Sequence, residues 1–143
     1  MKTVSWILLL LVGALTLVAS LGSAYVALSQ TPDGLVGPGL TLVNVSAPPE
    51  VVRAIRGRRV TASAYAAAFA LLFLAVVWFA YRRGEVWSWW AILVVSLVIF
   101  VIIGLRVPLL DTRAGVITAL VQLGIVVVAL LLDVGRLRSK PSA

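Results

Sequence analysis

The sequence contains no cysteine and no histidine among its 143 residues. The lack of cysteine excludes disulfide bonds and thiol redox chemistry, and the lack of both residue types excludes imidazole-ligated metal sites and the usual ligands of haem. Most schemes of general acid–base catalysis also depend on histidine. The composition therefore predicts a protein that is not an enzyme and that has no metal and no cofactor.

Charged residues are also scarce, at 12% of the chain, whereas hydrophobic residues make up 62%. Soluble domains contain about 25% charged and about 45–50% apolar residues, so this is the composition of a membrane protein. The net charge is +7, but the basic residues are scattered over short loops and tails. We expect them to form cationic collars at the headgroups of membrane lipids, and we expect no nucleic acid partner.

Four apolar stretches are long enough to cross a bilayer core, which needs about 20 helical residues. They cover residues 4–28, 60–81, 86–105 and 114–132, and a basic tail, 133–143, follows them. The small residues Gly22-Ser23-Ala24 resemble the cleavage site of a signal peptide. The first apolar run is longer than the usual hydrophobic region of a signal peptide, about 7–15 residues, so we interpret it as a transmembrane helix. The predicted fold is all-α: one integral membrane domain, 1–143, built as a four-helix transmembrane bundle with up-down-up-down topology.

The long connection, residues 29–59, divides into two parts. Leu35 to Val45 is apolar and follows a turn signal at Thr31-Pro32-Asp33-Gly34, so it is predicted to lie on the membrane surface as a lid. Ser46-Ala47-Pro48-Pro49-Glu50 then has the capping hydroxyl, prolines and acid of a helix start. We predict a short interfacial helix from Pro49 to Arg56, separate from the second span.

The turn Arg82-Arg83-Gly84-Glu85 is too short for anything but a tight hairpin between antiparallel helices. Aromatic residues flank it and are predicted to lie at the headgroup level of a bilayer: Trp78, Tyr81, Trp87, Trp89 and Trp90. After the third span, Pro108 is expected to stop the helix.

Small residues dominate 19–27 of the first span and 62–70 of the second. If the two helices are antiparallel, these stretches lie at the same depth, where small side chains allow close approach. Helices one and two are therefore predicted to make the closest contact in the bundle.

The hairpin Arg82-Arg83-Gly84-Glu85-Val86-Trp87-Ser88-Trp89-Trp90, preceded by Pro49-Glu50-Val51-Val52-Arg53-Ala54-Ile55-Arg56, resembles small uncharacterised four-helix bacterial membrane proteins grouped with the DoxX-like proteins. The resemblance covers residues 48–105. It implies a four-helix membrane fold and brings no activity, cofactor or catalytic residue with it.

Gln122 is the most polar side chain in the middle of a span. It is interpreted either as a contact for a lipid or quinone headgroup or as an interhelical hydrogen bond to Thr16, Ser20, Ser63 or Ser96. Gln122, Ser96 and Ser63 are the candidate ligand contacts. The densest cationic group is a candidate site for anionic lipid or a partner's acidic surface, or else a set of snorkelling side chains; it comprises Arg53, Arg56, Arg58 and Arg59. At the ends of the fourth span, Asp111 with Arg113 and Asp133 with Arg136 are expected to cap the helix or to pair on the surface.

The predicted function is that of an accessory or structural subunit in a larger membrane complex, whose other subunits are the expected partners. The alternative is a binder or carrier of a lipid, quinone or other hydrophobic small molecule. Lys and Arg are equally numerous on the two sides of the predicted bundle, six on each. The signal-like first run behind Lys2 and the short basic turn at 82–85 favour both termini in the cytoplasm of a bacterial cell, with the bundle in its cytoplasmic membrane.

Overall fold

The computed structural model describes residues 2–29, 48–110 and 116–138. In these ranges the chain forms four α-helices: α1 (Lys2–Leu28), α2 (Pro49–Val76), α3 (Val86–Leu110) and α4 (Val116–Leu132). A turn of π-helix, η1 (Val77–Tyr81), extends α2, and a 3₁₀-helix, η2 (Val134–Arg138), follows α4. No strand occurs in the described ranges, so the predicted all-α fold is confirmed there.

Three of these helical segments are long and apolar enough to cross a membrane. They are Thr3–Leu28, Pro49–Tyr81 and Val86–Leu109, and the shorter α4 is also apolar. These segments agree with the four predicted apolar stretches, although α4 has only 17 residues. At about 1.5 Å per residue, α4 spans about 25 Å, slightly less than the roughly 30 Å of a typical bilayer core.

The predicted interfacial helix at Pro49–Arg56 is wrong as a separate element, because α2 continues unbroken from Pro49 to Val76. Its predicted start is confirmed: the backbone N–H groups of Val51 and Val52 donate to the carbonyl of Pro48 at 2.9 and 3.2 Å. The predicted break lay between Arg56 and residue 60, where Gly57 is the one weak helix former, and a single glycine costs a helix only about 1 kcal/mol. The helical residues on either side of Gly57 offset this cost, so the helix continues.

The predicted stop at Pro108 is also wrong, since α3 extends to Leu110 with this proline inside it. A proline costs most in the middle of a helix, where it removes a backbone hydrogen bond and its ring meets the preceding turn. Pro108 lies in the last turn of α3, where two residues follow it. The predicted lid at 35–45 and the pair of Asp111 with Arg113 lie outside the described residues.

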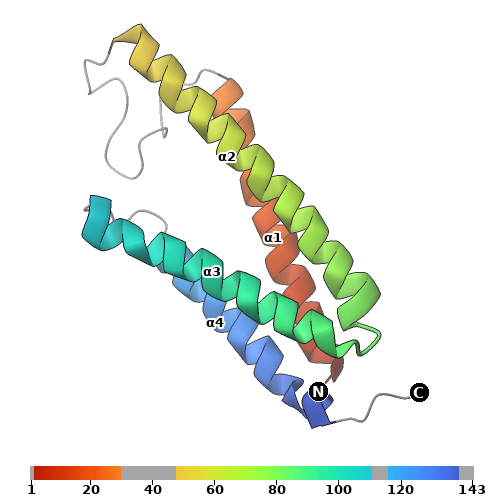
Figure 1. The fold of residues 1–143 in the computed structure, drawn as a ribbon. Helices are drawn as coiled ribbons and strands as arrows, with labels where there is room; N and C mark the ends of the chain where they lie inside the picture. The colour runs from red at the N-terminus through yellow and green to blue at the C-terminus, as the bar shows by residue number, and fades with distance from the viewer. Residues whose placement is uncertain (1, 30–47, 111–115, 139–143) are drawn as a thin grey trace. The chain divides into compact units, whose positions relative to one another are not determined.

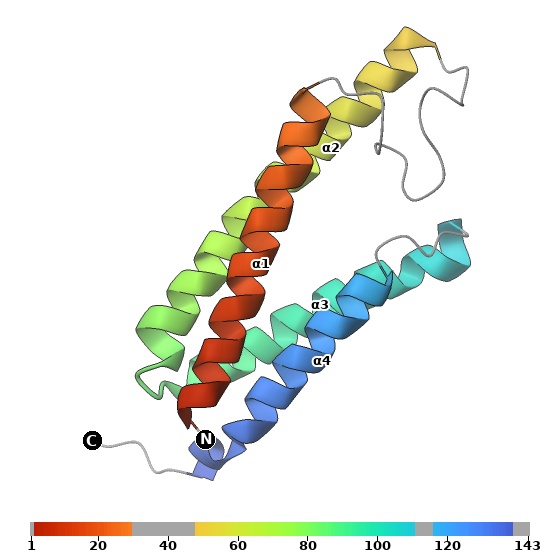
Figure 2. The same cartoon turned by 180° about the vertical axis from the view of Figure 1, so that it is seen from behind.

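The chain divides into two compact units, the first made of Met1–Ala14 and Leu72–Ala143. In this unit the start of α1, the end of α2 with η1, α3 and α4 run in alternating directions along the chain (Figures 1 and 2). α3 and α4 pack along each other. The core of the unit comprises side chains from all of these segments, among them Leu9, Val77, Tyr81, Ile92, Ala129 and Leu130.

The second unit, Leu15–Leu71, contains the second part of α1 and the first part of α2. These two segments lie side by side and antiparallel (Figures 1 and 2). Members of both predicted small-residue stretches are buried: Ser20 and Ala27 from α1, and Ser63 and Ala70 from α2. The predicted pairing of these stretches is thus supported, while the ranking of this contact as the closest in the bundle stays a prediction.

Candidate functional site

A π-helical turn, η1, lies between the end of α2 and the hairpin turn. In η1 the N–H of Arg82 donates to the carbonyl of Val77 at 3.0 Å, and the N–H of Glu85 donates to that of Ala80 at 3.2 Å. Each bond spans five residues, one more than in an α-helix, so the turn is wider. Gly84 then adopts φ +96°, which a residue without Cβ accepts without strain. The widened turn buries Ala80 and Tyr81 together, with Tyr81 fully enclosed.

The Tyr81 hydroxyl lies 2.6 Å from the Oγ of Ser5 on α1. The Ser5 hydroxyl in turn donates to the backbone carbonyl of Ala129 on α4 at 2.7 Å. Since a serine hydroxyl has a single proton, Tyr81 is the donor and Ser5 the acceptor in the first bond. One buried serine therefore connects three helical segments.

An ion pair completes this polar cluster from the C-terminal side of α4. Arg136 of η2 pairs with Asp133, and both side chains are almost completely buried, with exposed fractions of 6% and 1%. The Arg136 guanidinium also lies over the Tyr81 ring, 4.0 Å from its centroid, a cation–π geometry. We name Ser5, Tyr81, Asp133 and Arg136 the polar latch.

The polar latch corrects one expectation from the sequence. Asp133 and Arg136 do pair, but inside the unit, whereas pairing on the surface or helix capping was expected. Tyr81 is buried within its unit, while its predicted depth at the headgroup level stays a prediction. No single residue carried the signal, since Ser5 is one hydroxyl in an apolar run and its partners lie 76 and 124 positions away.

The other hairpin aromatics divide into two groups. Trp78, Trp87 and Trp90 are 46%, 55% and 51% exposed, as a position facing lipid headgroups requires. Trp89 is buried, and its indole N–H donates to the carbonyl of Leu130 on α4 at 3.0 Å. A buried indole needs such an acceptor, so this hydrogen bond from Trp89 connects α3 to α4.

The three predicted ligand contacts belong to two different units. Gln122 and Ser96 are half-buried residues of the first unit, whereas Ser63 is buried in the second unit. Ser20, a predicted partner of Gln122, donates to the carbonyl of Thr16 on its own helix at 2.7 Å. The interpretation of Gln122 as a ligand contact stays a prediction.

The four predicted cationic residues all lie on α2. Arg53 and Arg58 are exposed, while Arg56 and Arg59 are half-buried. Arg59 donates from Nε to the Oγ of Ser23 on α1 at 3.0 Å. Arg59 therefore contributes to packing within its unit. The contact of the four arginines with anionic lipid or a partner stays a prediction.

The described residues include no group of three or more Asp, Glu, His or Cys side chains suited to a metal ion. Comparison of the chain with protein families, with characterised proteins and with solved structures finds no match. The resemblance to DoxX-like proteins thus stays a prediction from the hairpin residues.

Proposed function

We propose that the chain is a four-span integral membrane protein that acts, without catalysis, as an accessory or structural subunit of a larger membrane complex. The length and apolar character of α1, α2 with η1, and α3 support the membrane location. Each is long enough for a bilayer core of about 30 Å. α4 is the proposed fourth span.

The observation that carries the proposal is the exposed apolar face of α3. Its large side chains recur at helical spacing of three or four and are roughly half exposed: Trp87, Trp90, Val94, Leu97, Val98, Val101, Ile102 and Leu105. Among the α3 side chains whose burial is described, the buried ones lie in the first two turns, at Ser88, Trp89 and Ile92. Most of α3 therefore offers its surface to lipid or to the helices of another subunit.

In the described ranges the chain offers mainly helix surfaces for contact with a partner. Without cysteine and histidine, its reactive side chains are carboxylates, hydroxyls and amines. Among the described residues, the buried side chains of the polar latch bind one another. Two further buried hydroxyls, those of Ser20 and Ser88, donate to nearby backbone carbonyls. A latch of this kind stabilises a bundle and leaves the exposed face of α3 as the functional surface.

We further propose that both termini face the cytoplasm and that the membrane is the bacterial cytoplasmic membrane. The basic turn Arg82-Arg83 and the basic C-terminal residues then lie on the side where positive charge is retained. A reporter fused after Ala143 is expected to be active in the cytoplasm. Activity only in the periplasm would reverse the orientation.

The subunit proposal is tested by photocrosslinking in native membranes. A benzophenone amino acid is placed at Val98 or Ile102 on the exposed face of α3, and in separate variants at Val18 of α1, which is 68% exposed, as a matched control. We expect one fixed protein to crosslink to both α3 positions and not to Val18. Crosslinks to lipid alone from all three positions would contradict a protein partner at this face and favour the binder of a hydrophobic small molecule.

A further inference from the structure

Arg82 lies at the exposed end of the hairpin, between two tryptophan rings. Its guanidinium carbon is 4.8 Å from the centroid of the Trp78 ring and 5.3 Å from that of Trp6. The two rings meet edge to face, with centroids 6.3 Å apart and planes at 85°. A cation within about 6 Å of an indole face is attracted to the ring. The three side chains therefore form an aromatic corner that holds one guanidinium, with Trp6 supplied by α1 and Trp78 by η1.

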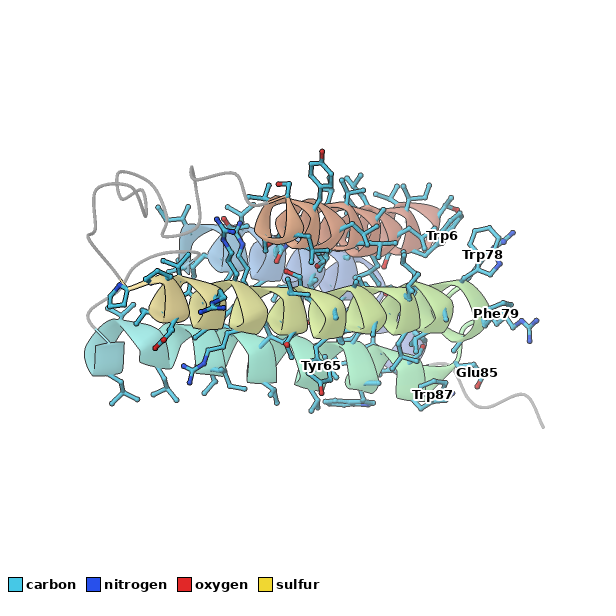
Figure 3. All side chains as sticks on the ribbon, turned by 90° about the horizontal axis from the view of Figure 1, so that it is seen from above. Trp6, Tyr65, Trp78, Phe79, Glu85 and Trp87 are labelled. Atoms are coloured by element: carbon cyan, nitrogen blue, oxygen red, sulfur yellow. The ribbon has the colours of Figure 1, made fainter. Side chains whose placement is uncertain are left out.

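The corner positions the guanidinium without using its N–H groups. Arg82 is exposed, and in the part of the chain that the structure describes its side chain contacts these two rings and forms no hydrogen bond or ion pair. Glu85, the nearest acid in sequence, lies with Trp87 on a different side of the bundle end from Trp6 and Trp78 (Figure 3). The rigid fork of five N–H donors is thus available to an anion from outside.

Apolar surface surrounds this fork. Trp78 and Phe79 extend outward at the bundle end (Figure 3), and they are 46% and 60% exposed. An inorganic anion gains nothing from exposed rings, whereas a phospholipid places its phosphate beside a glycerol backbone and acyl chains. Tryptophan also prefers this depth of a bilayer. The combination of an open fork and exposed rings matches a lipid better than a free ion.

We infer that Arg82, Trp6 and Trp78 form a binding site for the phosphate of an anionic phospholipid. The phosphate oxygens accept hydrogen bonds from the Arg82 fork, in the paired geometry that guanidinium groups form with phosphate. The exposed faces of Trp78 and Phe79 contact the lipid next to its phosphate. The site rests on the membrane location proposed above, and it is separate from the predicted cationic group on α2.

Arg83 provides the matched control for this site. It is the adjacent residue, it is also exposed, and its removal changes the net charge by the same amount. Within the described residues Arg83 contacts no aromatic ring, so its guanidinium is not positioned. If lipid binding depends only on positive charge, removal of either arginine should weaken it equally. If it depends on the aromatic corner, removal of Arg82 should weaken it more.

The test uses the full chain in nanodiscs made from an equimolar mixture of phosphatidylglycerol and phosphatidylcholine. The protein is released in mild detergent, and the lipids that remain bound are counted by native mass spectrometry. We expect phosphatidylglycerol to be enriched on the wild type, and Arg82→Gln to lower that enrichment roughly fivefold. Arg83→Gln should lower it less than twofold, and Trp78→Leu, which keeps all charges, should lower it measurably.

Equal losses for Arg82→Gln and Arg83→Gln would overturn the inference, because surface charge alone then explains the enrichment. Displacement of the bound lipid from the wild type by inorganic phosphate, at a concentration that leaves chloride without effect, would assign the site to a free anion and also overturn it. If Arg82→Gln loses its helical circular dichroism, Arg82→Lys replaces it, and only partial retention of the enrichment supports a fork-dependent site. Failure of the wild type to enter nanodiscs would contradict the proposed membrane location, and with it the site; entry without enrichment would contradict the site alone.

Discussion

The contacts inside one compact unit differ in kind from the contacts inside the other. In the unit of Met1–Ala14 and Leu72–Ala143, a buried serine, a tyrosine and an ion pair connect segments far apart in the chain. In the unit of Leu15–Leu71, buried small side chains lie on two antiparallel segments, and the Arg59–Ser23 hydrogen bond joins them. Specific polar pairs stabilise the first unit, whereas the close approach of two helical segments stabilises the second.

This difference bears on how precisely each unit fixes its register. A buried hydroxyl or charge without its partner costs free energy, so a shift of one helix against another is penalised in the first unit. Small side chains tolerate sliding, because each position along the stretch offers a similar surface. We therefore expect substitutions in the polar latch to destabilise the protein more than substitutions in the small-residue unit.

The largest effect is expected for Arg136→Leu, because it leaves the buried carboxylate of Asp133 without its cation. Loss of one partner of a buried ion pair costs roughly 3–5 kcal/mol. The measurement is the free energy of unfolding in mixed detergent micelles, followed by helical circular dichroism. Arg83→Leu, at an exposed arginine, should change it by less than about 0.5 kcal/mol. A loss for Arg136→Leu as small as that of the control would show that the pair is hydrated.

Ser5→Ala should have the next largest effect, about 2 kcal/mol, because the Tyr81 hydroxyl loses its acceptor and the Ala129 carbonyl loses a donor. Tyr81→Phe should cost less, since Ser5 then keeps its bond to Ala129. The double variant should fall short of the sum of the two single losses, which measures the coupling between the hydroxyls. Strict additivity would mean that the two hydroxyls do not interact.

A pair of glycines in α1 compares the units directly. A Cβ added at Gly13 would lie 2.7 Å from Cδ2 and 2.9 Å from Cγ of Leu74, whereas at Gly22 it meets nothing within 4 Å. Gly13→Ala is expected to destabilise by about 1 kcal/mol, since Leu74 must shift. Gly22→Ala should be neutral or stabilising, because alanine has the higher helix propensity. Thermal unfolding of both variants in the same detergent checks this, and the reverse order would contradict the packing around Gly13.

The smallest effect is expected for Ser23→Ala, which removes the acceptor of the Arg59 Nε–H in the second unit. Because this bond is only partly buried, water replaces the lost partner, and the expected cost is below about 1 kcal/mol. The same unfolding measurement applies. A loss equal to that of Ser5→Ala would remove the distinction between the two units.

The sequence predicted well what depends on local pattern. Apolar runs placed the helices, the small residues of 19–27 and 62–70 include buried members of one unit, and Pro48-Pro49-Glu50 marked the start of α2. The errors at residues 57–59 and at Pro108 arose because a glycine or a proline weakens a helix without always ending it. Their effect depends on the length of helix on either side.

The polar latch was not predictable from such patterns. Asp133 and Arg136 are adjacent in sequence to an apolar run, which suggests an exposed helix end, and their burial depends on Tyr81 of a different segment. The buried position of Tyr81 depends on the π-helical turn η1. No residue type in the sequence predicts such a turn. Contacts between residues 76 or 124 positions apart become visible only once the fold is known.

The most direct test of the proposed function is the composition of the particle extracted from native membranes in mild detergent with a tag after Ala143. A subunit of a larger complex is expected to migrate well above its own 15.2 kDa, together with the same other membrane proteins in a fixed ratio across independent preparations. Recovery of a monodisperse, isolated chain with one lipid or quinone bound per molecule, lost on Gln122→Leu, would contradict the subunit proposal and establish the binder instead.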